Sequence, residues 1–324
     1  MAPESLRESQ AQFFDTNPPL NPWPQLLRDY GLRRLYKPRE AFWAQALKEL
    51  ELNENTSVLD LGCGEGIWLE RLAQEYGVRG TGIDVSGASL VTAQSETEHH
   101  CSFALSDGYR LPFGDNSFDC VLSFDTLEHV SDHSGFLREM QRVLKTQGHL
   151  FLWSINRRQE YTWNWLLDRV GVDVFDRVAH DPEIIPDPSI VVGTIENAKV
   201  SVRKLEYFNS FFTLALDELI MVMVSFFSRI GLFTPDGGIR DAFGRGFLTA
   251  SHAITGLLWR ALNALDRPWQ VRGLSNGFLV LATKAADSKE IASFDQINNI
   301  RLIETPIASA IDRSGGVGGS LSYD

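Results

Sequence analysis

The stretch Val58-Leu-Asp-Leu-Gly-Cys-Gly-Glu-Gly66 joins a short apolar run to Gly62, Gly64 and Gly66. A strand that leads into a glycine loop and then a helix lets the backbone approach a ligand closely, because glycine has no side chain to clash. The first N–H groups of the helix can then bind an anionic group, either a phosphate or an amino-acid carboxylate. The stretch therefore predicts a ligand-binding loop after a first strand over Ser57 to Leu61.

Outward from this loop, short apolar runs alternate with helical patterns. Such alternation is typical of a parallel sheet covered by helices on both faces. We therefore expect an α/β fold with a doubly wound, seven-stranded, mostly parallel sheet. The expected strands are 57–61, 80–84, 102–105, 118–124, 149–154, 200–207 and 277–283, and the expected helices of the core are 66–76, 87–97, 133–144 and 188–198.

Two further carboxylates end predicted strands. Asp84 ends the second strand, and Asp107 follows the third. A carboxylate in the first position can accept hydrogen bonds from ribose hydroxyls, and one in the second from an exocyclic amine. The glycine spacing is G-x-G-x-G, whereas dinucleotide binders favour G-x-G-x-x-G. With Asp60 before the loop, the set fits a ligand that has a ribose, an amino base and a cationic centre.

Three motifs in order give the chain a family resemblance. They are VLDLGCGEG at 58–66, GIDVS at 82–86 and SDGYRLPFGDNSFDCVLSFDTLEHV at 106–130. This set resembles the class I methyltransferases, in the subgroup that includes the ubiquinone-biosynthesis enzymes, over about residues 50–156. The resemblance implies a Rossmann-like methyltransferase fold, S-adenosyl-L-methionine as cofactor, and methyl transfer to a small-molecule acceptor.

The resemblance also implies cofactor contacts. The loop around Gly62 and Gly64 would wrap the methionine part, and Asp60 would lie near its amine. Asp84 would hold the ribose, and Asp107 would read adenine. The full implied set is Asp60, Gly62, Cys63, Gly64, Asp84, Val85, Asp107, Gly108, Ser123 and Phe124, the last two lying against the sulfonium. Two alternatives stay open: a dinucleotide-type loop for another ligand, and a loop-bracing role for Asp60.

Asp125, Glu128 and His129 are the candidate catalytic residues. If the segment after the fourth strand is helical, spacings of three and four place all three side chains on one face. His129 could then act as a general base for a hydroxyl. A similar E-x-x-E-H binds a metal in ubiquinone O-methyltransferases and small-RNA 2'-O-methyltransferases, so a divalent cation is a second interpretation. A structural role is the third, and we commit to no metal ligand.

The pattern of apolar runs and helical stretches divides the chain into six parts. Residues 1–50 form an N-terminal helical extension, 51–156 the cofactor-binding core, 157–208 an acceptor-pocket insertion with the sixth strand, 209–276 a helical insertion, 277–284 the seventh strand and 285–324 a flexible tail. Amphipathic patterns predict helices near 211–228 and 247–265 within the helical insertion. This insertion has three interpretations: a lid, a homodimer interface, or a peripheral membrane contact through 209–265.

Aromatic residues are frequent in the segments that can cover the ligand edge, which favours an aromatic or lipid-like acceptor. We expect an O-methylation. The alternatives are methylation of a sugar or polar lipid headgroup, and a non-catalytic protein that binds the cofactor and acts as an interaction module.

Composition narrows the partners and the compartment. The formal net charge of −12 argues against a nucleic-acid partner. The cluster from Arg28 to Arg39 is either a solvated helix face or a surface for an anionic lipid or substrate. Three cysteines without metal or disulfide spacing fit a reducing compartment. With no apolar signal segment or membrane span expected, we predict a cytoplasmic protein.

Overall fold

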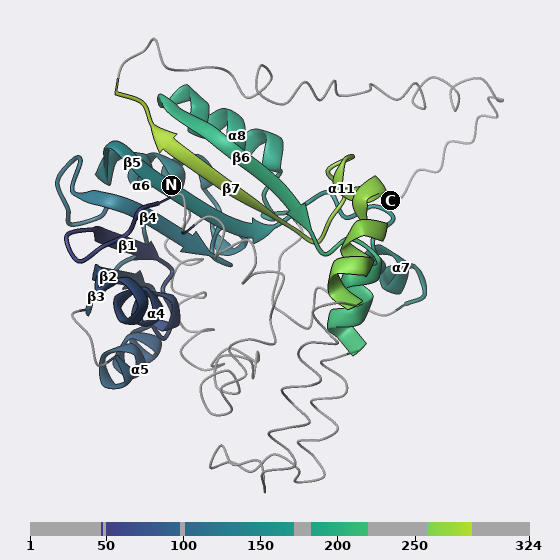
Figure 1. Ribbon diagram of the computed structural model, residues 1–324, viewed down its shortest axis with the longest axis horizontal. Helices are drawn as coiled ribbons and strands as arrows, with labels where there is room; N and C mark the ends of the chain where they lie inside the picture. The colour runs from purple at the N-terminus through teal and green to yellow at the C-terminus, as the bar shows by residue number, and fades with distance from the viewer. Residues whose placement is uncertain (1–46, 48–49, 98–100, 172–182, 220–257, 287–324) are drawn as a thin grey trace, which may run out of the picture.

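A seven-stranded sheet organises the computed structural model, which describes residues 47, 50–97, 101–171, 183–219 and 258–286 (Figure 1). The strand order is β3-β2-β1-β4-β5-β7-β6. Only β7 is antiparallel to its neighbours among the described strands, so the predicted fold class is confirmed. The strands are β1 (Ser57–Leu61), β2 (Arg79–Asp84), β3 (Cys101–Leu105), β4 (Phe118–Phe124), β5 (Leu144–Ile155), β6 (Val200–Phe208) and β7 (Gly277–Lys284).

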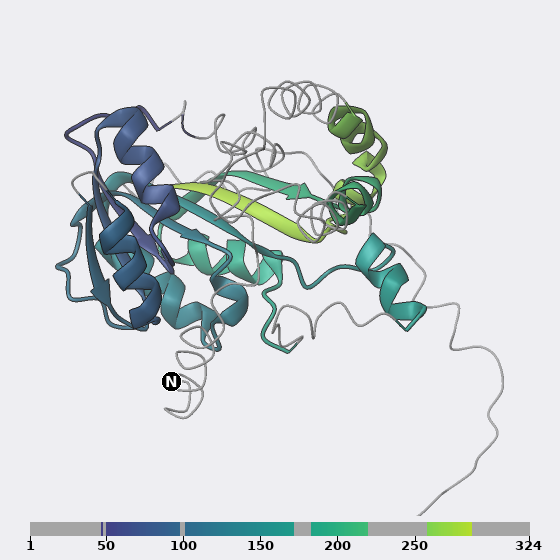
Figure 2. The ribbon, with the colours of Figure 1, turned by 90° about the horizontal axis from the view of Figure 1, so that it is seen from below.

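Helices cover both faces of this sheet, because alternate strand residues point to opposite sides. Val58 and Leu122 pack under α4 and α5, whereas Leu59 and Val121 pack under α6 and α8. Figure 2 shows the helices on either side of the strands. The helices with described bounds are α4 (Ile67–Tyr76), α5 (Gly87–Glu96), the 3-10 helix η2 (Leu127–His129), α6 (His133–Val143), α7 (Trp163–Arg169), α8 (Pro188–Asn197) and α11 (Arg267–Gln270).

Element boundaries follow the predictions closely, with three differences. β5 begins at Leu144, five residues before the expected His149, because its first residues pair with Phe118 across a bulge. The second is α7, which begins after Thr162, whose hydroxyl accepts a hydrogen bond from the Trp165 amide. The short helix α11 is the third. Neither helix was expected, since both are too short to show a periodic pattern.

The helical insertion is described only at its two ends. Residues 212–219 and 258–265 are helical, as predicted, and the rest of both predicted helices lies outside the described residues. So do the N-terminal extension before residue 47, the cluster from Arg28 to Arg39 and the predicted tail. None of the helices within the described ranges combines the length and the apolar character that crossing a bilayer requires.

The two ends of the insertion are joined by one buried carboxylate. Asp266 precedes α11, and its Oδ1 accepts hydrogen bonds from the amides of Phe211 and Phe212. Its Oδ2 accepts from the Thr213 amide and hydroxyl. The helix at 212–219 is therefore capped by a residue more than fifty positions later in the chain. Both views place these helices together at one end of the sheet, near the start of β7 (Figures 1 and 2).

An Asp266→Ala substitution should destabilise the protein strongly, because it leaves three amides and a hydroxyl without their acceptor in the fold interior. We expect a loss of about 3 kcal/mol in the free energy of unfolding, measured by urea titration. The matched control is Asp187→Ala, which removes a half-exposed cap of α8 that accepts from Ser189 alone. That control should lose about 1 kcal/mol. Equal losses in the two variants would contradict a special role for Asp266.

Candidate functional site

The glycine loop after β1 is held against the end of β2. The amides of Gly62 and Cys63 both donate to the Ile83 carbonyl, at 2.7 and 3.0 Å. The next glycine amide, of Gly64, donates to Asp84 Oδ2 at 2.8 Å. Because the Asp84 carboxylate also accepts from the Ser86 amide at 2.8 Å, one side chain fixes both the loop and the turn after β2.

Glycine is required in this loop for two reasons. Gly62 and Gly64 have φ angles of 77° and 52°, in the left-handed region that side chains disfavour. A Cβ on Gly62 would also collide with the Thr126 side chain. A Cβ on Gly64 would meet nothing within 4 Å, because this part of the loop faces open space.

That open space belongs to a cavity of about 210 Å³ at the carboxyl ends of β1, β2 and β4. Ligands in α/β sheets bind at this edge. The cavity is lined by Leu61, Gly62, Gly64, Ile83, Asp84, Val85, Ser89, Ser106, Asp107, Gly108, Tyr109, Asp125, Thr126, His129, Val130 and Phe136. The structure thus brings together Gly62, Gly64, Asp84, Val85, Asp107, Gly108, Asp125 and His129 from the predicted site.

The charge of this lining is one-sided. Among the described residues around the cavity, Asp84, Asp107 and Asp125 are acidic, and none is lysine or arginine. Such a lining disfavours a pyrophosphate and favours a cationic ligand that also offers hydroxyl or amine donors. The three carboxylates of the lining therefore fit a sulfonium nucleoside better than a dinucleotide.

Three predicted cofactor residues lie behind the cavity wall instead of in it. Ser123 is buried, and its hydroxyl donates to the Leu61 carbonyl at 3.0 Å. Phe124 packs between Trp68 and Phe151. Burial raises the pKa of the Cys63 thiol, and the Cys63 backbone amide donates to the Ile83 carbonyl. These residues hold the end of β1 and the glycine loop in place.

Asp60 also lies outside the lining, on β1 and 1% exposed. Neither carboxylate oxygen has a hydrogen-bond partner among the described residues. Burial, followed by repulsion from Asp84, raises the pKa of Asp60 to about 7. The side chain is therefore largely protonated when the solution is slightly acidic.

The predicted face of Asp125, Glu128 and His129 does not form. Asp125 has a φ of 49°, so the chain turns sharply before η2 and no continuous helix joins the three residues. Asp125 and His129 both line the cavity, whereas Glu128 does not. Glu128 is buried, and its Oε2 accepts from the Ser154 hydroxyl at 2.7 Å. Across the described part of the chain, no three His, Cys, Asp or Glu side chains converge as metal ligands.

His129 lines the cavity and is a titratable residue with a shifted pKa. Desolvation by burial lowers its pKa to about 4, because the surroundings penalise the imidazolium form. The ring is therefore neutral across the physiological range, with one nitrogen lone pair that can accept a proton.

Sequence reasoning missed several lining residues, among them Ser106, Tyr109, Thr126 and Phe136. Thr126 closes over Gly62, and its hydroxyl donates to the Phe124 carbonyl at 2.9 Å. Both Ser106 and Thr126 follow closely after a strand, which is a signal that could have found them. Phe136 had no such signal, since it reaches the cavity from inside α6.

Comparison with known proteins is consistent with this geometry. The family described as a methyltransferase domain matches residues 59–152. Among solved structures, the fold is similar to that of a chain in a complex from Haloferax volcanii. That complex joins the Trm112 methyltransferase activator to a methyltransferase, and the alignment has a TM-score of 0.51 at 18% identity. The alignment covers 86% of this chain and 98% of that one. At this identity the likeness shows the fold alone.

Two curated relatives overlap the same region. Norajmaline N-methyltransferase of Rauvolfia serpentina is 30% identical over 42% of this chain and 54% of its own length. The 2-methyl-6-phytyl-1,4-hydroquinone methyltransferase of Synechocystis sp. is 37% identical over 34% of this chain and 35% of its own. The chain therefore spans about half or less of the length of the curated relatives it matches.

The unusual acidity of Asp60 makes stability depend on pH. Between the unfolded pKa of 3.8 and the folded value of about 7, the folded protein binds more protons than the unfolded chain. Stability therefore falls as pH rises through this window, by a few kcal/mol. An Asp60→Asn variant has no carboxyl group here, so its stability should not fall in this window. Measured by urea unfolding, the free energy of unfolding of the variant minus that of the wild type should increase from pH 4 to pH 7.5.

Asp119→Asn is the control with the opposite sign. Partial burial raises the pKa of Asp119, but hydrogen bonds from Ser57 and Lys145 outweigh this effect and lower it. That variant should lose stability relative to the wild type as pH rises from 3 to 5. A parallel pH dependence of Asp60→Asn and the wild type would show that Asp60 ionises normally.

Sequence and structure point to the same kind of domain. The structural features are the glycine loop held by β2, the cavity at the carboxyl edge of the sheet and the strand order. The sequence feature is the family match over residues 59–152. Over residues 59–152, this chain is therefore similar in sequence to methyltransferase domains.

Proposed function

We propose that the protein is an S-adenosyl-L-methionine-dependent methyltransferase acting on a small molecule. The observation that carries the proposal is the cavity with three aspartates and no described cationic side chain, set against a glycine loop. A sulfonium ligand brings the positive charge that such a lining favours. Its ribose and amino base supply donors for carboxylates at the strand ends.

Asp84 and Asp107 are the residues that would hold this cofactor. Each already accepts one or more backbone hydrogen bonds that orient its carboxylate, from Gly64 and Ser86 for Asp84 and from Tyr109 for Asp107. A carboxylate has about four acceptor sites, so each can accept further bonds from a ligand. Gly64 leaves room for close approach of the methionine part.

When bound, this cofactor would supply a methyl group on a positively charged sulfur. The acceptor atom would bond to the methyl carbon in line with the carbon–sulfur bond, and the sulfur would leave as the neutral thioether of S-adenosylhomocysteine. The protein must therefore align the acceptor and, for a hydroxyl, remove its proton. His129 is the residue that we assign to proton removal, because its imidazole lines the cavity in the unprotonated form that a base requires. Burial weakens it as a base, so the assignment rests on its position. Thr126, Val130 and Phe136 form less polar walls that limit the access of water.

We further propose an aromatic or lipid-like acceptor and an O-methylation. The names of the two curated relatives support a bulky acceptor, one being norajmaline and the other a hydroquinone with a phytyl group. The first name gives nitrogen as the methylated atom of that relative, and the second names no atom. Our choice of oxygen therefore rests on His129. The homodimer, the membrane contact through 209–265 and the cytoplasmic location stay predictions.

The protein should bind S-adenosylhomocysteine at one site per chain in isothermal titration calorimetry. An Asp84→Asn variant should bind at least about tenfold more weakly, because an amide group presents a donor to the Gly64 or Ser86 amide and loosens the loop. Glu75→Gln, which changes an exposed acid on α4, should bind as the wild type does. A folded wild type that binds neither S-adenosylhomocysteine nor S-adenosylmethionine would contradict the proposal.

A labelled-methyl assay against a total lipid extract tests the acceptor and His129 together. We expect label in phenolic or hydroxylated lipids, identified by mass spectrometry. A His129→Gln variant should incorporate label about 100-fold more slowly and bind S-adenosylhomocysteine normally. The control is His149→Gln, which changes a histidine on β5 that contacts Thr283.

Other outcomes of this assay select the alternatives. Label in sugars or polar headgroups would favour the second acceptor class. Binding of the cofactor without any transfer would favour a non-catalytic interaction module. Normal transfer by His129→Gln would leave His129 with a packing role, and the reaction would then depend on alignment alone.

A further inference from the structure

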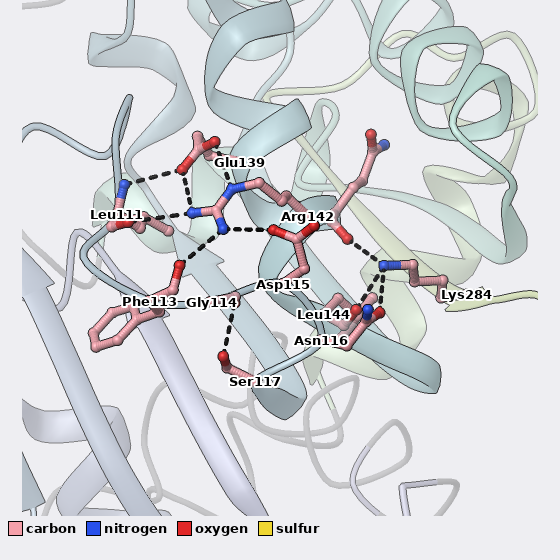
Figure 3. A network of polar contacts seen from close by, with 11 residues as sticks. Leu111, Phe113, Gly114, Asp115, Asn116, Ser117, Glu139, Arg142, Leu144 and Lys284 are labelled. Carbon is pink, nitrogen blue, oxygen red and sulfur yellow. Dashed lines mark hydrogen bonds and ion pairs between the residues drawn. The ribbon is translucent and has the colours of Figure 1, made fainter.

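The loop between β3 and β4 is attached to one face of α6. Its first residues, Ser106 to Tyr109, line the cavity. Its later residues lie beside Glu139 and Arg142, in the last turns of α6 (Figure 3). The Leu111 amide donates to Glu139 Oε2 at 2.9 Å, and Arg142 donates to the Leu111 and Phe113 carbonyls at 3.2 and 2.8 Å.

Every N–H of the Arg142 guanidinium is used in this arrangement. Besides the two carbonyls, Nε and Nη2 bind the two oxygens of Glu139, each at 2.9 Å, and Nη1 binds Asp115 at 2.9 Å. An arginine side chain has five N–H donors in a fixed plane, and all five have acceptors here. We call Glu139, Arg142 and Asp115 the Arg142 cluster.

The acidity of the cluster agrees with this geometry. The hydrogen bond from Arg142, which outweighs the effect of burial, lowers the pKa of Glu139, and the bonds to Glu139 and Asp115 raise the pKa of Arg142. Both shifts favour the charged forms of the two groups. The arginine side chain is 30% exposed, and the Glu139 side chain 18%, so solvent screens the pair only in part.

The first turn of α6 holds the other end of the same loop. The Tyr109 hydroxyl accepts from the Asp132 amide at 3.2 Å, and the Tyr109 ring packs edge-on against Phe136. A Cβ on Gly108 would clash with Phe136, so the loop backbone lies directly on this ring. The helix therefore fixes the loop at two points, one at the cavity and one at the Arg142 cluster.

Strand β7 holds the far end of this arrangement. Lys284 donates to the Gln141 and Leu144 carbonyls at the end of α6, at 2.8 and 2.7 Å. It also donates to Asn116 Oδ1 at 3.0 Å, where the loop returns to β4 (Figure 3). The loop and the helix that carries it are thus joined to the sheet as one unit.

We propose that Glu139 and Arg142 are positioning residues for the methyl-donor site. They act through the loop, by setting the distance between Asp107 and the glycine loop on the other side of the cavity. This inference rests on the proposed function, because it assumes that Asp107 and Gly108 contact the donor. Neither Glu139 nor Arg142 lines the cavity among the described residues, so direct contact with the ligand is not their role.

The proposal separates donor affinity from the chemical step. Without the Arg142 cluster, the loop between β3 and β4 would become ordered only when the methyl donor binds. The conformational entropy lost at that moment would weaken binding. Once the donor is bound, His129 and Thr126 are unchanged, since they belong to the segment after β4. We therefore expect KM for S-adenosylmethionine to rise while kcat at saturation stays within about twofold.

The test compares Arg142→Ala, Arg142→Lys and Glu139→Gln in the full chain. Calorimetry measures the Kd for S-adenosylhomocysteine, and hydrogen exchange measures protection of the amides between Leu111 and Ser117. We expect Arg142→Ala to raise Kd at least tenfold and to increase exchange at Leu111, Asn116 and Ser117. Arg142→Lys should lie between this variant and the wild type, because an ammonium supplies three donors and no fork.

Arg71→Ala is the matched control. It breaks an ion pair of similar length with Glu75 within α4, and neither Arg71 nor Glu75 is among the described residues that line the cavity. Its Kd and the exchange of residues 111–117 should match the wild type. Glu139→Gln retains the volume of the side chain, so it keeps the test valid if Arg142→Ala does not fold.

The outcomes are distinguishable. A wild type that does not bind S-adenosylhomocysteine overturns the proposed function and this inference with it. A wild type that binds, with unchanged Kd in Arg142→Ala and Glu139→Gln, overturns the inference alone. An equal increase of Kd in Arg71→Ala also overturns it, since general destabilisation would then explain the effect.

Discussion

Three consecutive backbone amides, from Gly62 to Gly64, donate to the last two residues of β2, and the rest of the site depends on this contact. It gives the glycine loop a defined shape without a ligand, so little conformational freedom remains to be lost on binding. Because the acceptors are Ile83 and Asp84, the loop after β1 and the turn after β2 form one rigid wall.

The opposite wall is built differently. The loop after β3 has no regular secondary structure. Near the cavity, the Phe136 side chain of α6 supports it. Farther away, the Arg142 side chain and backbone bonds from Asn116 and Ser117 hold the loop to the end of α6. Backbone bonds to a strand are short and fixed, whereas side-chain bonds can rearrange with a change of rotamer. The two walls should therefore differ in stiffness, with the glycine loop as the fixed reference and the loop after β3 as the adjustable one.

Much of the core could be predicted because its signals are local. β1 and β4 have the predicted bounds, since each is a short apolar run between turn residues. The face of Asp125, Glu128 and His129 could not be predicted, because it depends on the left-handed conformation of Asp125, and a spacing argument assumes a helix. The Asp266 cap was equally hidden, since its partners lie more than fifty residues earlier in the chain.

The cap by Asp266 has a consequence for how the chain can change over evolution. The insertion leaves the core near Asn209 and returns near Asn276, and the amide of Asn276 donates to the carbonyl of Asn209 at 2.8 Å. Entry and exit are thus neighbours, so the intervening segment can lengthen, shorten or be exchanged at small entropic cost to the core. Under the proposed function, a duplicated gene could acquire a different acceptor by replacing this segment as a unit, without any change to the sheet and the cavity at its edge.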